Sequence, residues 1–121
     1  MYGDSSVIRK RATQVRDQGS DVRALADQLV ATTEALSWTG RAARDLHAIV
    51  TERASELRAA AAAHATAADL LDRHGQEVAR LQEAVAENER RFRDRQTAGE
   101  LPAGTEPPPP GHKDWLTYEL P

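Results

Sequence analysis

A seven-residue repeat of apolar side chains dominates this sequence. Before residue 37 the repeat falls at Ile8, Val15, Val22, Leu29 and Leu36, and after residue 40 at Ala43, Val50, Leu57, His64, Leu71, Val78, Val85 and Phe92. This spacing puts each set on one face of an α-helix, which is typical of helices that pack lengthwise on other helices. All six prolines follow residue 101, so no earlier residue is a strong helix breaker. The sequence therefore predicts an all-α fold, an antiparallel two-helix hairpin.

The two stripes are separated by Ser37-Trp38-Thr39-Gly40. Gly40 can take backbone angles that other residues resist, which suits a turn. We expect a first helix over residues 5–37, capped by one of Asp4, Ser5 or Ser6, a turn at 38–40, and a second helix over residues 41–95. His74-Gly75 is the place where the second helix could kink. The hairpin domain is then residues 1–98, followed by a proline-rich tail over residues 99–121.

Small side chains accompany the first stripe. Four residues after its members come Ala12, Gly19, Ala26 and Thr33, and Leu25 extends the same face. Glycine inside a helix costs about 1 kcal/mol relative to alanine, so we expect Gly19 to allow close approach of the second helix. On the second helix, a second stripe falls three residues after the members of the first. It holds Leu46, Ala60, Ala67 and Leu81, and it is interrupted by Arg53, His74 and Asn88.

The predicted helices differ in length, which leaves apolar residues uncovered. The first helix reaches along the second only to about Leu71, because both rise about 1.5 Å per residue. Three covers are possible for the residues beyond: a second chain, a fold-back at Gly75, or a return of the tail. We favour a second chain, which would form a four-helix bundle on dimerisation. The expected partner interface is Val15, Val22, Leu29, Leu57, Leu71, Val78, Leu81, Val85 and Phe92.

The tail combines a stiff spacer with an apolar end. Residues 106–111 read Glu-Pro-Pro-Pro-Pro-Gly, a polyproline segment. The end of the chain carries two aromatic residues within a few positions, and we interpret it as a docking segment formed by Trp115, Leu116, Tyr118 and Glu119.

Charge and composition argue against several classes of function. Residues 1–95 hold fifteen basic and fifteen acidic side chains, so nucleic acid is not the expected partner. No long apolar run is present, which predicts neither a cleavable leader nor stable membrane insertion. The chain has no cysteine, and His64 and His74 are ten residues apart, too far for a helical metal pair. No catalytic constellation is recognisable, so we expect no enzyme activity, cofactor or metal.

These features resemble a known family. Trp38-Thr39-Gly40 between two amphipathic helices resembles the WXG family of small type VII secretion substrates. Leu36-Ser-Trp38-Thr-Gly40-Arg-Ala42-Ala43 with Ala67-Ala68-Asp69-Leu70-Leu71 is similar to the helical signal domains at the N-termini of actinobacterial secreted toxins. The resemblance covers residues 5–95. It implies export from the cytoplasm without a cleavable signal peptide, as a homodimer or as a heterodimer with a related hairpin or a toxin, through a secretion ATPase.

In that family the Trp-x-Gly turn, here Trp38 and Gly40, is half of a composite export signal. The other half is a Tyr-x-x-x-Asp/Glu motif after the second helix. The one aromatic-x-x-x-acid match in this chain is Trp115-x-x-x-Glu119, with tryptophan in place of tyrosine. The alternative function, from another class, is a cytoplasmic coiled-coil adaptor or chaperone with a proline-linked docking peptide.

Overall fold

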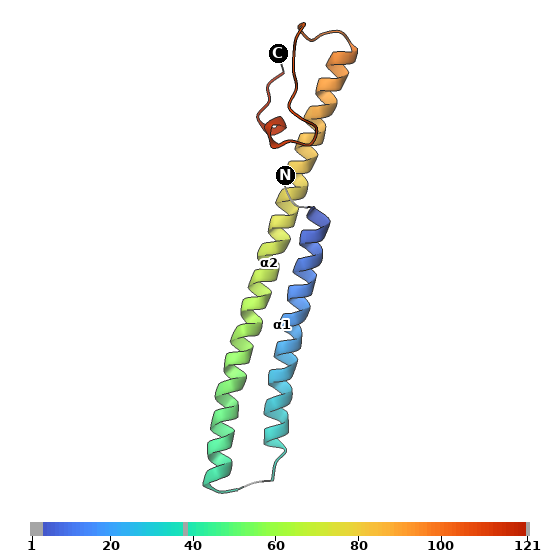
Figure 1. Cartoon of the computed structure of the whole chain (residues 1–121). Coiled ribbons are helices and arrows are strands. Elements are labelled where there is room, and N and C mark those ends of the chain that lie inside the picture. The colour runs from blue at the N-terminus through green and yellow to red at the C-terminus, as the bar shows by residue number, and fades with distance from the viewer. Residues whose placement is uncertain (1–3, 38, 121) are drawn as a thin grey trace. The chain divides into compact units, whose positions relative to one another are not determined.

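The computed structural model describes residues 4–37 and 39–120 (Figure 1). It contains two long α-helices, α1 (Ser5–Glu34) and α2 (Arg41–Thr97), and one short 3-10 helix, η1 (Lys113–Leu116). Within the described ranges there is no β-strand, and the predicted all-α helical hairpin is confirmed at this level. The chain forms two compact units, Arg9–Asp72 and Met1–Ile8 with Arg73–Pro121. Each is described separately below.

The ends of α1 follow the local signals in the sequence. The Asp4 carboxylate accepts hydrogen bonds from the Ser6 amide at 2.9 Å and the Ser6 hydroxyl at 2.8 Å, which lowers the pKa of Asp4. This is a helix N-cap, and it fulfils the expectation for residues 4–6. The helix ends at Glu34, three residues before the predicted boundary, and the Leu36 amide then bonds to the carbonyl of Thr33 at 3.2 Å.

α2 begins directly after Gly40 and is continuous. Gly40 has φ of +100°, a conformation that favours glycine, and its carbonyl accepts the Arg44 amide at 3.1 Å. The helix passes through His74 and Gly75 as one element of 57 residues, so the fold-back at Gly75 that we considered as one possible cover does not occur.

The hairpin unit is held together by small residues. Within Arg9–Asp72, α1 and α2 run antiparallel and side by side (Figure 1). The contact line, which we call the small-residue seam, consists of Ala12, Gly19 and Ala26 of α1 and Ala54, Ala61 and Ala68 of α2, all buried. A Cβ atom added to Gly19 would lie 2.8 Å from the Cβ of His64 and 3.2 Å from the carbonyl oxygen of Ala61. The predicted close approach at Gly19 is therefore confirmed.

The register of α2 in this seam differs by one residue from our expectation. Ala60 and Ala67 are exposed, whereas Ala61 and Ala68 are buried. Alanine occupies every position from 59 to 63, so the sequence pattern could not identify which of them faces α1.

The C-terminal unit has a core of its own. Residues 98–104 reverse the chain after α2, with Gly99 and Gly104 at positive φ. Residues 105–120, which we call the strap, then lie beside the end of α2 (Figure 1). Val85 and Phe92 of α2 are buried with Trp115 of the strap, at exposed fractions of 6%, 4% and 3%. Leu101, Leu116, Tyr118 and Leu120 pack around them.

Candidate interaction surfaces

The hairpin unit has two unlike sides, which follow from its seam. At about 100° per residue, a side chain three positions after a seam residue lies about 60° to one side, and one four positions after lies about 40° to the other. Arg16, Arg58 and Asp72 each come four positions after a seam residue. Val15, Val22, Leu29, Leu57, His64 and Leu71 each come three positions after one.

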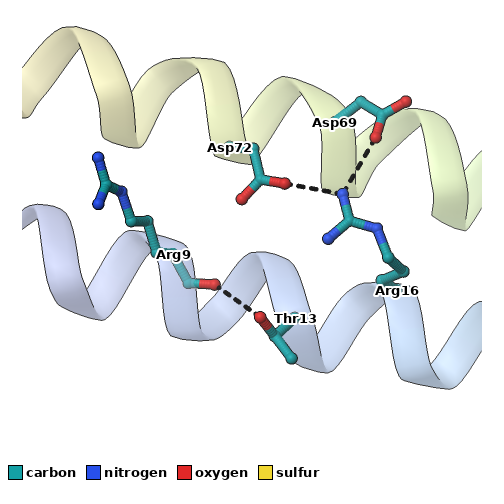
Figure 2. Close-up of polar contacts among 5 residues, drawn as sticks. All are labelled: Arg9, Thr13, Arg16, Asp69 and Asp72. Carbon is teal, nitrogen blue, oxygen red and sulfur yellow. Dashed lines mark hydrogen bonds and ion pairs between the residues drawn. The ribbon is translucent and has the colours of Figure 1, made fainter.

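Ion pairs identify the first side. The Arg16 guanidinium bonds to Asp69 at 3.0 Å and to Asp72 at 2.8 Å across the hairpin, as Figure 2 shows. These hydrogen bonds raise the pKa of Arg16. A second cross-helix pair joins Arg58 to Asp27 at 2.7 Å. This side of the hairpin, the polar face, is therefore already satisfied by contacts within the chain.

The opposite side, which we call the apolar face, is only partly covered. Because Arg16 and Asp72 meet on the polar face, the residues three positions after the seam on both helices share the other face. All six of them are half-buried, and Leu25 extends the surface with 55% of its area exposed. Val15, Val22, Leu29, Leu57 and Leu71, which we predicted as interface residues, thus lie together on one face.

His64 belongs to this apolar face and has a local role. Its Nδ1 atom donates to the carbonyl of Ala60 at 2.9 Å, and its Cβ lies over Gly19. Among the described residues, no group of three or more histidine, aspartate and glutamate side chains could hold a metal ion.

The turn end carries a second surface. A hollow of about 370 Å³ lies where the end of α1 meets the start of α2. Its walls include Thr33, Leu36, Gly40, Ala43, Leu46 and His47. Trp38, the residue that we singled out in this turn, lies outside the described residues. The hollow is open to solvent, and its lining combines apolar side chains with Glu34 and Arg44.

The third surface is covered by the strap. Trp115 stacks edge-on against Phe92, with ring centroids 5.7 Å apart, and Tyr118 meets Trp115 at 5.3 Å. Asn88 of α2 donates to the Trp115 carbonyl at 2.6 Å, and the Trp115 indole donates to the carbonyl of Pro109 at 2.9 Å. Glu89 of α2 accepts the Gly111 amide.

This arrangement changes the role we expected for the tail. Val85 and Phe92 are covered by the return of the chain's own tail, not by the second chain that we favoured. The docking segment docks on α2, with Trp115 and Leu116 in or against the core. Of the Trp115-x-x-x-Glu119 match, Trp115 is buried and Glu119 is exposed. Sequence reasoning did not assign Asn88 and Glu89 to the strap, although a polar Asn88 on an apolar stripe was the available signal.

No described helix is both long enough and apolar enough to cross a lipid bilayer. Comparison of the chain with known family models, with curated proteins and with solved structures finds no match.

Proposed function

We propose that this chain is a small helical secretion substrate or targeting module of the type VII kind, which pairs through its apolar face with a helical hairpin partner. The turn around Trp38 and Gly40 is then the part presented to the export machinery, including its ATPase. The chain acts by binding, and its helices carry no reaction.

The unequal sides of the hairpin carry this proposal. Ion pairs within the chain complete the polar face, whereas six half-buried side chains line the apolar face. Burying an aliphatic side chain of this kind fully contributes about 1.5–3 kcal/mol relative to leaving it exposed. A second pair of helices laid on this face would cover both stripes at once, which is how four-helix bundles close their cores.

Partner binding is tested by native mass spectrometry of the chain co-expressed with its genomic neighbours. We expect a one-to-one complex, or a homodimer, that Leu57→Glu abolishes. Ala59→Glu is the matched control, because Ala59 is exposed and five positions after the seam residue Ala54. A chain that stays monomeric with all neighbours, and shows cooperative melting, would rule out pairing through this face.

Export is tested separately, by measuring the chain in culture medium of its native host. We expect the chain to be secreted, and we expect Trp38→Ala to abolish its secretion. Ser37→Ala, at the neighbouring exposed position, is the control and should be secreted like the wild type. Retention of the wild-type chain in the cytosol, regardless of Trp38, would favour the adaptor function instead.

A further inference from the structure

A type II turn ends the proline run of the strap and fixes it to α2. The His112 amide donates to the Pro109 carbonyl at 3.1 Å, and Gly111, the third residue of this turn, has φ of +72°. The Gly111 amide donates to Glu89 of α2, and the Trp115 indole donates to the same Pro109 carbonyl at 2.9 Å. The end of the run is therefore held both by the helix and by the buried indole.

A second type II turn precedes the run. The Thr105 amide donates to the Pro102 carbonyl at 3.3 Å, and Gly104, again the third residue of the turn, has φ of +84°. The Thr105 hydroxyl donates to the same carbonyl at 2.7 Å. Leu101, next to this turn, packs against the core that contains Phe92. The proline run is thus held at both of its ends.

Between the two turns the backbone has the geometry of a polyproline II helix. Residues 106–109 each precede a proline, which restricts them to extended angles, and each proline fixes its own φ at about −65°. The peptide bonds of the described residues are all trans. Pro110 is the second residue of its type II turn, a position where ψ is about +120°. The prolines at 107–110 therefore complete one turn of this helix, which has about three residues per turn.

Three of the four prolines are exposed. Pro107 and Pro110 are three residues apart, so they share one edge of the polyproline helix, and both are exposed. Pro109 is also exposed, whereas Pro108 is half-buried. The described core cluster around Trp115 includes none of the four prolines. Their rings therefore add little to the hold of the strap on α2, and the edge with Pro107 and Pro110 faces solvent.

We propose that the edge formed by Pro107 and Pro110 is a recognition site, and that its partner is a protein domain with a groove lined by aromatic rings. Such grooves bind polyproline II segments, which are already ordered before binding. The turns at both ends add to this order, and a preorganised ligand loses less conformational freedom when it binds. Within one docked strap, Trp115 covers α2 and the proline edge is presented outward. This site lies in the C-terminal unit and does not depend on the function proposed above.

Binding is tested by calorimetric titration of the full chain with three isolated probes, an SH3, a WW and an EVH1 domain, which all bind polyproline II segments in aromatic-lined grooves. We expect saturable one-to-one binding to at least one probe, and displacement of the chain by an excess of that probe's own proline-rich peptide ligand. Pro107→Ala combined with Pro110→Ala should weaken binding by about tenfold or more. Pro108→Ala, at the half-buried position, is the matched control and should change binding by about twofold or less.

Hydrogen exchange of the strap and circular dichroism check that the variants keep the wild-type structure. We expect wild-type exchange in each variant, because the proline rings lie outside the core. If exchange rises in the double variant, displacement of the wild-type chain by the proline-rich peptide decides the question. The proposal is overturned if no probe binds, if the peptide does not displace the chain, or if Pro108→Ala weakens binding as strongly as the double variant. It is also overturned if a free peptide of residues 104–113 binds a probe and the full chain does not, because the docked strap would then shield the prolines.

Discussion

Replacing Gly19 by larger residues tests the close packing on which the hairpin unit depends. A Cβ atom at this position would lie 2.8 Å from the Cβ of His64 and 3.2 Å from the carbonyl oxygen of Ala61. Neither atom is the end of a flexible side chain, so one helix must shift. Overfilling a packed contact costs about 1–3 kcal/mol. Against this, alanine gains about 1 kcal/mol over glycine in helix propensity.

The two effects predict a net loss of up to about 2 kcal/mol for Gly19→Ala and a larger loss for Gly19→Val, whose propensity gain is smaller and whose bulk is greater. Stability is measured by urea denaturation followed by far-ultraviolet circular dichroism. The expected order of stability is glycine, alanine, valine. An isolated or exposed helix would give the order alanine, valine, glycine, and that order would refute direct contact of α1 and α2 at Gly19.

A double variant separates steric conflict from any other effect. In the double variant Gly19→Ala with His64→Gly, the glycine is on α2 and the Cβ atom is on α1. The shortest contact of the new Cβ, with the Cβ of His64, is then absent. We expect the double variant to be more stable than the sum of the single changes predicts, with a coupling of about 0.5–3 kcal/mol. Additive effects would mean that residues 19 and 64 do not touch.

Three further outcomes follow from the structure. Ala61→Leu should destabilise the chain by about 1–3 kcal/mol in urea denaturation, while the adjacent exposed Ala60→Leu should be close to neutral; equal effects would contradict the seam register. Asn88→Ala removes the bond to the Trp115 carbonyl and should cost about 0.5–1.5 kcal/mol, with faster hydrogen exchange in the strap as the direct readout. Hydrogen bonds from the neighbouring arginines, Arg90 first, lower the pKa of Glu87. The stability that its ion pairs contribute is therefore complete above the ordinary glutamate pKa and is lost as the pH falls through the lowered value. Glu87→Gln should flatten that part of an acid titration of helix content, and an unchanged titration would count against the ion pair.

Much of the hairpin could be predicted from the sequence, because its signals are local. The seven-residue repeat and the absence of proline before residue 102 indicate two helices, and Gly40 marks the start of the second. Gly19 inside a helix is unfavourable unless something passes close to it, which predicted the contact with His64 and Ala61. These inferences need only helix periodicity and the cost of glycine.

The alanine register could not be predicted in the same way. Large apolar residues were taken as the centre of the contact, with small residues at its edge. In the structure the small residues Ala12, Gly19 and Ala26 form the centre, because only small side chains let two helix axes approach closely, and the valines and leucines move to the flank. Within the alanine run of residues 59–63, periodicity carries no information on which alanine faces α1.

The sequence pattern also could not predict that the chain's own tail covers the end of α2. Val85 and Phe92 require burial, and a second chain or a returning tail would satisfy that requirement equally. The choice depends on whether residues 98–104 can reverse the chain, and on a fit among Phe92, Trp115 and Tyr118 that only three-dimensional packing determines. Gly99 and Gly104, both at positive φ, provide the reversal.

The size of the buried side chains changes along α2. Over residues 54–68 the buried residues are alanines, which suit a helix at close range, and over residues 78–92 they are valine and phenylalanine, which hold a neighbour further away. A single partner helix cannot be equally close to both stretches. The two stretches of α2 are therefore suited to different neighbours, and variants in them should act on different readouts. Leu57→Glu should affect pairing through the apolar face and leave strap exchange unchanged, whereas Trp115→Ala should do the reverse.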